Sequence, residues 1–284
     1  MVEVNSWLTG RRGVSLPFAD HCAPLCSDKE AFNRLLEAVI GLGKRRNWRY
    51  LEMRGGRSLF DEALPATSFY GHQLDLSTGA QALFGGFSDS VRRAIRKAEK
   101  SGVSIEFTRD IKSVRVFHEL LCLTRKRHGV PPQPFSFFKQ IHQHILAPGK
   151  GWVVIARHQG RPVAGAVFFH FGQAALYKFG ASDETQQNLR ANNLIMARSI
   201  EWHAQNNFTS FDFGRTSQHN EGLRNFKLGW GAKESQIEYV RIAPQNSEFL
   251  SAPDKDGGFS QRLFNHLPLP VSRLIGNLLY RHAA

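Results

Sequence analysis

Three consecutive strand patterns between residues 152 and 181 constrain the fold of this 284-residue chain more than any other feature. They are WVVIAR (152–157), PVAGAVFFHF (162–171) and AALYKFGA (174–181), all rich in β-branched or aromatic residues. A Gln-Gly turn at 159–160 and Gly172 separate them, as in antiparallel hairpins. The sequence therefore predicts an antiparallel meander whose middle strands are apolar enough to be buried on both faces.

Helical patterns flank the meander. Before it, helices are expected over about 113–127 and from Phe135 to Ile145. After it, a helix at 193–205 leads directly into the strand FTSFDFG (208–214), and a last strand covers 236–242. This order predicts an α+β fold and excludes a doubly wound Rossmann sheet.

The first 87 residues predict a smaller β-α-β-β unit. A strand and loop are expected at 13–25, a helix over 31–40 capped by Asp28, and strands at 48–54 and 68–76. We place a domain boundary at residue 88, where a basic helix begins. The chain is thereby divided into residues 1–87, residues 88–245, and a linker with a C-terminal amphipathic helix at 246–284.

The charge balance indicates anionic partners. The chain has 37 Lys and Arg residues against 24 Asp and Glu, a formal net charge of +13. Such a chain attracts phosphates, nucleic acid or an anionic membrane face. No apolar run reaches the roughly 18–20 residues of a membrane span, and no signal segment is evident. The odd number of cysteines, three, then favours a reducing, cytoplasmic location.

Two basic clusters are candidate phosphate sites. The helix after Ser88 repeats cations at helical spacing and could bind a phosphate backbone or a nucleotide diphosphate. Its basic residues are Arg92, Arg93, Arg96, Lys97 and Lys100. A solvated helix face is the alternative interpretation. The second cluster covers residues 125–128 and includes Arg127.

The C-terminal segment combines aliphatic and basic residues in an amphipathic pattern. It either docks on the core, our default, or rests on the inner face of an anionic membrane. Its members are Leu263, Leu267, Leu274, Ile275, Leu278 and Leu279 with Arg262, Arg273 and Arg281.

We expect no metal site. His21, Cys22 and Cys26 lack a second ligand pair at zinc spacing. His142 and His144 are two residues apart on a predicted helix and so point in different directions.

Five segments carry a resemblance to a known family. Together they resemble the Fem-type (FemA/FemB-like) acyltransferases, which are two-lobed members of the GNAT superfamily, and specifically their exosortase- and exopolysaccharide-associated branch. The segments are VRRAIRKAEKSGV (91–103), RHGVPPQPFSFF (127–138), GRPVAGAVFF (160–169), LYKFGAS (176–182) and FDFGRTSQHNEGLRNFKLGWGA (211–232). The resemblance implies a GNAT-like fold with a shortened N-terminal lobe. It also implies N-acyl or aminoacyl transfer to an amine of a cell-envelope precursor or polysaccharide sugar.

Direct acyl transfer needs a neutral amine, a donor carbonyl within reach and donors for the oxyanion, but no covalent nucleophile. Accordingly, the sequence has no G-x-S-x-G elbow, and Cys122 has no base at a telling spacing. The resemblance implies that a splayed strand, LYKFGAS, supplies backbone N–H groups, with Gly180 allowing close approach.

Four charged side chains are candidates for substrate chemistry. Asp212 is either a base that positions the amine or a carboxylate that holds the turn after its strand. Lys227, with Arg215 at the same mouth, is the candidate hydrogen-bond donor to the developing oxyanion, to a donor phosphate or to a substrate carboxylate. The alternative is that both belong to a solvated basic loop. Lys178 is a substrate-binding candidate or a charge that protects an edge strand.

The donor stays undecided between acyl-CoA and aminoacyl-tRNA, and no bound cofactor is expected. CoA-dependent GNAT enzymes hold the pyrophosphate with a glycine-rich loop, whereas here no glycine occurs between Gly180 and Gly214. Arg190 and the cap-type residues Asn192 and Asn193 remain, enough for one anion contact but not for a phosphate cradle. No coiled-coil insertion of the kind that tRNA-binding Fem enzymes often carry is present. The acceptor is expected to be a phosphate-bearing or lipid-linked precursor. A non-catalytic polyanion-binding protein and a CoA-dependent acetyltransferase of small amines are the alternatives.

Overall fold

A single mixed sheet of ten strands runs through the part of the chain that the computed structural model describes, residues 1–61, 63–251 and 265–282. The strand order is β1-β2-β3-β10-β4-β9-β8-β7-β6-β5. The strands are β1 (Val2–Ser6), β2 (Gly10–Val14), β3 (Leu51–Arg54), β4 (Thr67–Asp75), β5 (Ser104–Thr108), β6 (Gly151–His158), β7 (Arg161–Phe171), β8 (Ala174–Ser182), β9 (Ser210–Ser217) and β10 (Lys233–Ile242). The predicted α+β class is confirmed.

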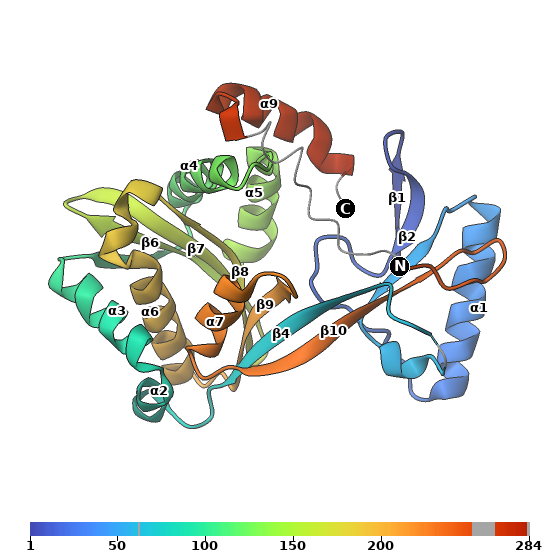
Figure 1. The fold of residues 1–284 in the computed structure, drawn as a ribbon, viewed down its shortest axis with the longest axis horizontal. Coiled ribbons are helices and arrows are strands. Elements are labelled where there is room, and N and C mark those ends of the chain that lie inside the picture. The colour runs from blue at the N-terminus through green and yellow to red at the C-terminus, as the bar shows by residue number, and fades with distance from the viewer. Residues whose placement is uncertain (62, 252–264, 283–284) are drawn as a thin grey trace.

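Helices cover both faces of this sheet (Figure 1). They are α1 (Lys29–Arg45), α2 (Ala80–Gly86), α3 (Asp89–Lys100), α4 (Ile111–Arg127), α5 (Phe135–Ile141), α6 (Ala191–Gln205), α7 (Glu221–Leu228) and α9 (Leu269–Leu279). A π-helical turn, His142–Leu146, follows α5. None of the described helices is both long and apolar enough to cross a membrane.

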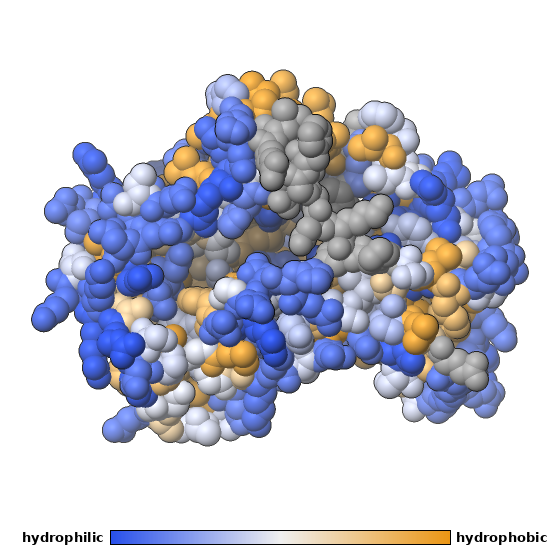
Figure 2. All heavy atoms as spheres, viewed as in Figure 1, coloured by the Kyte–Doolittle hydropathy of each residue, from blue (hydrophilic) through white to orange (hydrophobic). Residues whose placement is uncertain are grey.

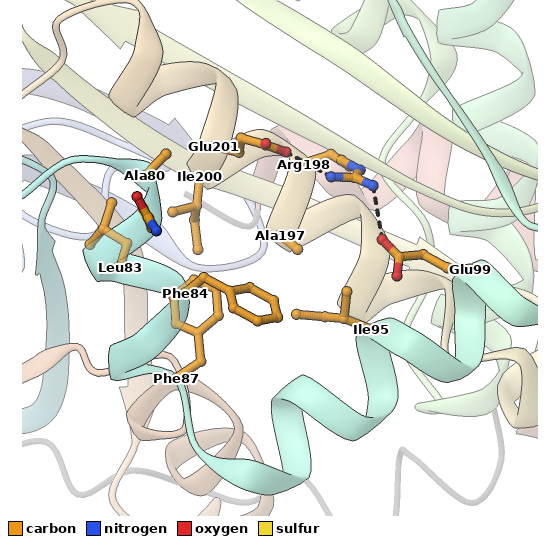
Figure 3. A pocket seen from close by; sticks show the side chains of 11 residues that line it. Ala80, Leu83, Phe84, Phe87, Ile95, Glu99, Ala197, Arg198, Ile200 and Glu201 are labelled. Atoms are coloured by element: carbon orange, nitrogen blue, oxygen red, sulfur yellow. Dashed lines mark hydrogen bonds and ion pairs between the residues drawn. The ribbon is translucent and has the colours of Figure 1, made fainter.

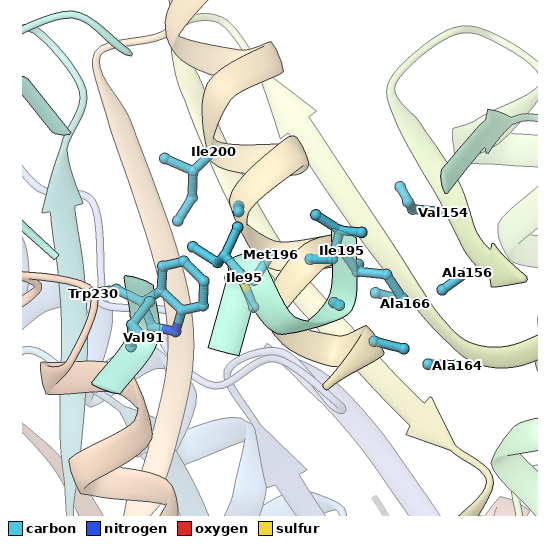
Figure 4. Close-up of a cluster of buried hydrophobic side chains, with 14 of the residues drawn as sticks. Val91, Ile95, Val154, Ala156, Ala164, Ala166, Ile195, Met196, Ile200 and Trp230 are labelled. Atoms are coloured by element: carbon cyan, nitrogen blue, oxygen red, sulfur yellow. The ribbon is translucent and has the colours of Figure 1, made fainter. Parts of the chain in front are cut away.

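The predicted meander is confirmed. β6, β7 and β8 pair in antiparallel order, and β7 is buried from Val163 to Phe168. One face of these strands packs on α3 and α6, with Val154, Ala164 and Ala166 against Ile95 and Ile195 (Figure 4). The other face packs on α4 and α5 through a second cluster that includes Val153, Ile155 and Val167. Burial on both faces explains why these strands are apolar throughout instead of alternating.

The N-terminal unit differs from its predicted pattern in two elements. The β1–β2 hairpin closes through Gly10 at φ +81°, whereas we expected only a strand and loop from residue 13. α2 is a further element, in a segment without a clear apolar period. The helix capped by Asp28 is confirmed as α1, because the Asp28 carboxylate accepts a hydrogen bond from the Ala31 N–H at 2.7 Å.

Two long strands, β4 and β10, connect the two halves of the molecule (Figure 1). β10 lies between β3 and β4, so a strand from late in the chain completes the part of the sheet that begins with β1 to β3. The division of the chain at residue 88 falls between α2 and α3 and stays a prediction.

The C-terminal helix docks on the core, which confirms our default expectation. α9 lies against α4, with Ser272 and Gly276 buried. Gly276 lies so close to the Pro132 carbonyl that a Cβ there would overlap it. Of the predicted amphipathic pattern, Arg262 and Leu263 lie outside the described residues, as does the side chain of Arg281.

Candidate active site

A cavity opens where two parallel strands in the middle of the sheet separate. β8 and β9 pair only from Ala174 to Leu176 and from Ser210 to Asp212. Beyond these residues the strands diverge, and a cavity of about 570 Å³ lies between residues 177–182 of β8 and residues 213–215 of β9. The ends of α4, α6 and α7 form the remaining walls, together with Asp20 from the loop after β2.

Both strands carry a bulge where they separate. In β8, Tyr177 pairs with Phe168 and Phe179 with Val167, which leaves Lys178 as the extra residue. In β9, residues 213 and 214 face the single residue His72 of β4. Bulges redirect side chains and interrupt strand pairing. The two irregularities therefore open the sheet and direct charged side chains into the opening.

The backbone of Gly180 faces the cavity. The neighbouring Asp183 N–H donates to Val163 O of β7, whereas the Ser182 N–H donates to Thr124 Oγ1 on the opposite side. Because alternate residues of an antiparallel strand direct their N–H and C=O groups to the same side, those of Gly180 point away from β7 as those of Ser182 do. The N–H of Gly180 is thus aimed into the gap that β9 has left.

Tyr177 adds a hydroxyl donor next to this N–H. A Cβ on Gly180 would overlap the Tyr177 hydroxyl, so this hydroxyl lies against the Cα of Gly180. Burial raises the pKa of Tyr177 to about 12, and the hydroxyl therefore stays protonated. The backbone N–H and the phenol together form a pair of donors that an oxyanion or a leaving oxygen or sulfur can use.

Gly180→Ala tests the contact between Gly180 and Tyr177. The methyl group should displace the phenol and lower kcat/KM at least about tenfold, since one donor of the pair is lost. Gly85→Ala, on α2, is the matched control, since an added Cβ there meets no atom within 4 Å, and it should change kcat/KM by less than about threefold. Transfer kinetics with a thermal unfolding curve for each variant provide the measurement; equal activity of Gly180→Ala and the wild type would contradict this geometry.

Lys227 is an almost fully buried lysine in the cavity wall, 2% exposed. Its ammonium group donates to Gly214 O at 2.7 Å and to Arg215 O at 3.0 Å. An ammonium has three N–H donors, so one remains for a substrate. Burial lowers the pKa of Lys227 to about 8, while Asp20 and Asp212 act in the opposite direction.

Asp20 reaches the cavity from the loop between β2 and α1. Its backbone is anchored by Tyr239, whose hydroxyl donates to Asp20 O at 2.7 Å, and by Lys178, which donates to Phe18 O at 2.7 Å. The carboxylate lies 3.7 Å from Lys178 Nζ and 3.7 Å from Arg215 Nε, longer than hydrogen bonds. It is thus oriented by two cations but keeps capacity for a further donor.

Gly214 makes room for this carboxylate. Its φ is +70°, and a Cβ there would lie 2.8 Å from Asp20 Oδ2. A side chain at this position would therefore be strained and would push Asp20 out of the cavity.

Arg215 is held firmly at the mouth of the cavity. Its guanidinium stacks 4.2 Å from the Phe69 ring centroid and donates to the Tyr239 hydroxyl at 2.9 Å. Lys178, by contrast, is not a solvated charge that protects a strand edge, because its ammonium is turned inward, donates to Phe18 O and lies 3.7 Å from Asp20. That alternative interpretation of Lys178 is wrong, and burial lowers its pKa.

Asp212 lies behind the cavity wall. Its carboxylate accepts a hydrogen bond from the Gly214 N–H at 2.6 Å, which is the turn-holding role that we weighed against catalysis. Burial raises its pKa, and the nearby Asp20 carboxylate acts in the same direction. The residue itself does not line the cavity. Its assignment as the base stays a prediction, and Asp20 is the carboxylate that faces the space.

The α4 wall is cationic. Arg125, Arg127 and His128 line the cavity, and within the described chain no hydrogen-bond partner exists for the buried Arg127 Nη1. Such a group has capacity for an anion. Of the predicted anion contacts at the start of α6, Asn192 lines the cavity, whereas Arg190 and Asn193 do not.

The basic helix α3 lies apart from this cavity. Arg92 is committed to local structure, since it donates to Gly85 O, Phe87 O and Asp89. The other four predicted phosphate ligands, Arg93, Arg96, Lys97 and Lys100, are exposed on the outer face of the helix. Their role as a phosphate or polyanion patch stays a prediction.

A second cavity, of about 400 Å³, lies between α2, α3 and α6 (Figure 3). Its wall is mainly apolar and includes Phe84, Phe87 and Ile95. At its border Arg198 forms ion pairs with Glu99 and Glu201, each with an N···O distance of 2.8 Å. Since its charged groups neutralise one another, we place the chemistry in the first cavity. Nowhere in the described ranges do three His, Cys, Asp or Glu side chains gather as a metal site.

Several residues that line the cavity were not among the individual site residues predicted from the sequence. Asp20 is separated from Gly214 by most of the chain, and no local pattern marks it. Tyr177 lies in the segment LYKFGAS next to Lys178, so two polar side chains in an apolar strand were the available signal. Arg125 and His128 belong to the predicted cluster at 125–128.

Comparison with known proteins gives a family and a fold. The model of the family described as acetyltransferase (GNAT) domain matches residues 86–233, just over half of the chain. A comparison with the sequences of curated proteins gave no match.

Solved structures share the fold at low sequence identity. FemX has a TM-score of 0.60 and 17% identity, over 75% of this chain and 77% of its own. The C-terminal domain of a protein described as a lysylphosphatidylglycerol synthetase, from Agrobacterium fabrum, has a TM-score of 0.55 and 12% identity, over 75% and 73%. A tandem GNAT protein from the clavulanic acid biosynthesis pathway has a TM-score of 0.51 and 13% identity, over 77% and 71%.

Proposed function

Because the chain belongs to the acetyltransferase (GNAT) domain family, we propose that it moves an acyl or aminoacyl group directly onto an amine in the cavity between β8 and β9. The observation that carries this proposal is the divergence of the two strands, which exposes the Gly180 backbone near the Tyr177 hydroxyl in a cavity that Lys227 also lines. The proposed acceptor is an amine of a cell-envelope precursor or of a polysaccharide sugar.

In the proposed mechanism the donor carbonyl enters the gap between the strands. The Gly180 N–H and the third N–H of Lys227 stabilise the oxygen as negative charge develops on it. The Tyr177 hydroxyl donates to the leaving oxygen or sulfur. The amine forms the new C–N bond, and the bond to the leaving group then breaks.

Asp20 receives the amine in this mechanism. Its carboxylate accepts a hydrogen bond from the incoming nitrogen and takes the proton that the amine loses. Lys178 and Arg215 orient the carboxylate, and Asp212 positions the Gly214 turn below it.

The charges of the cavity favour an anionic substrate. Arg125, Arg127, Lys178, Arg215 and Lys227 face a single carboxylate, that of Asp20. A phosphate or carboxylate on the acceptor or donor would compensate this charge and bind the free Nη1 of Arg127.

An aminoacyl donor is the first choice. The loop before α6 has no glycine, and its 3₁₀ turn, Glu184–Leu189, ends at Arg190 with a left-handed backbone. This differs from a loop of consecutive N–H groups around a pyrophosphate. The name of the lysylphosphatidylglycerol synthetase neighbour, which describes attachment of lysine, further supports aminoacyl transfer. Acetyl-CoA is the second candidate because of the family description.

Transfer of a radiolabelled group tests the proposal. Purified protein is incubated with charged bulk tRNA or with acetyl-CoA as donor, and with UDP-linked muramyl peptide or glucosamine as acceptor. We expect label in an amide product with at least one pair. Binding of the same ligands without product, and with affinity that disappears at high salt, would instead indicate a polyanion-binding protein.

A further inference from the structure

The outer face of α9 is aliphatic and exposed. Val271, Leu274 and Leu278 are 41%, 59% and 57% exposed, and their spacing of three and four residues places them on one side of the helix. The opposite side carries the buried Ser272 and Gly276, against α4. The helix therefore binds the core through small residues and directs its large aliphatic side chains outward.

The tip of the β1–β2 hairpin extends this apolar surface. Trp7 and Leu8 are 80% and 53% exposed. The Trp7 ring lies 5.7 Å from the His282 ring, and Thr9 Oγ1 donates to His282 O at 3.4 Å, so the tip contacts the turn that follows α9. Figure 1 shows the hairpin tip and α9 on the same side of the molecule, and Figure 2 shows hydrophobic residues at the top, where α9 lies.

The chain is basic, with a net charge of +13, and residues 265–282 contain no Asp or Glu. On the hairpin, Arg11 is exposed three residues after Leu8. Arg273 is directed toward α4, where it acts on the buried Cys122 thiol and on His118. An apolar stripe without acidic neighbours along its helix, next to an exposed tryptophan on a basic chain, is typical of segments that lie in a membrane interface.

We propose that this surface, formed by Trp7, Leu8, Val271, Leu274 and Leu278, docks the protein onto a bilayer that contains anionic lipid. A stable protein partner would require roughly 20–30 residues a side, whereas interfacial insertion needs only a few large apolar side chains with cations around them. The bilayer therefore fits the small, protruding and basic character of the surface better than a second protein chain does.

Docking in this way places the active-site cavity near the membrane. α4 contacts α9 and, through its end, supplies Thr124, Arg125 and Arg127 to the cavity. A substrate anchored in the bilayer would thus reach the cavity across a single helix. The docking itself does not depend on the proposed chemistry.

Vesicle flotation tests the inference with the full-length protein. We expect the wild type to float with vesicles of phosphatidylcholine and phosphatidylglycerol (3:1) and to bind pure phosphatidylcholine at least about tenfold more weakly, because both apolar insertion and charge contribute. The double variant Leu274→Ser/Leu278→Ser and the single variant Trp7→Ser should each lower the partition coefficient about tenfold or more on anionic vesicles.

Phe171→Ser and Leu25→Ser are the matched controls, since these side chains are 81% and 97% exposed and lie outside the proposed surface. They should bind like the wild type, and all variants should unfold at similar temperatures. Equal flotation of the wild type and the double variant would overturn the proposal. So would a wild type that ignores vesicles but forms dimers in light scattering that the double variant abolishes.

Discussion

Lys227→Met should lower kcat/KM by about a hundredfold or more, the loss expected when one oxyanion donor is removed. Methionine fills a similar volume but cannot donate to the substrate or to the carbonyls of Gly214 and Arg215, which Lys227 now satisfies. Transfer assays under subsaturating donor measure the loss. Lys233→Met, an exposed lysine at the start of β10, is the matched control and should leave kcat/KM unchanged.

The pH dependence provides an independent readout of Lys227. Burial lowers its pKa to about 8, so the ammonium is the main form below pH 8 and the neutral amine above it. The charged form is the stronger donor. We therefore expect kcat/KM of the wild type to fall on the alkaline side with an apparent pKa near 8. Residual activity of Lys227→Met should lack this fall; an unchanged alkaline limb in the variant would exclude Lys227 as its source.

Substitution of Asp20 should lower the rate of transfer much more than substitution of Asp212. Asp20→Asn should lower kcat about a hundredfold or more, because the amide cannot accept the proton of the amine. Asp212→Asn should have a smaller effect, about tenfold or less, since its carboxylate holds the Gly214 N–H and an amide oxygen can accept the same bond. Single-turnover kinetics of both variants, with unfolding curves, give the comparison.

The reverse order of the two effects would reassign the base. A large loss in Asp212→Asn with near-normal Asp20→Asn would restore the base role that the sequence pattern suggested for Asp212. Equal and small effects would indicate that water carries the proton without either carboxylate.

Much of the fold around the cavity was predictable from local patterns. The meander was predictable because strands that are buried on both faces must be apolar throughout, as β7 is from Val163 to Phe168. α1 was predictable from its cap, Asp28, and its apolar period. The β1–β2 hairpin was missed because its strands have only five residues each and carry few apolar side chains.

The site was predictable only where its residues belong to segments with a recognisable local pattern. Lys178, Gly180, Arg215 and Lys227 come from two nearby motifs, and the structure brings them to one cavity. Asp20 enters through tertiary packing, held by Tyr239 and Lys178. Such an arrangement has no local signature, since neither the loop nor its anchors show a periodic pattern.

If the reacting groups meet between the diverging strands β8 and β9, a bound donor should slow amide hydrogen exchange in both strands. Amide exchange is followed by mass spectrometry with and without a saturating donor, either acetyl-CoA or charged tRNA. We expect slower exchange in peptides that cover residues 177–182 and 213–215. Protection confined to the second cavity, in peptides that cover residues 80–87 and 197–201, with no change between the strands, would contradict it.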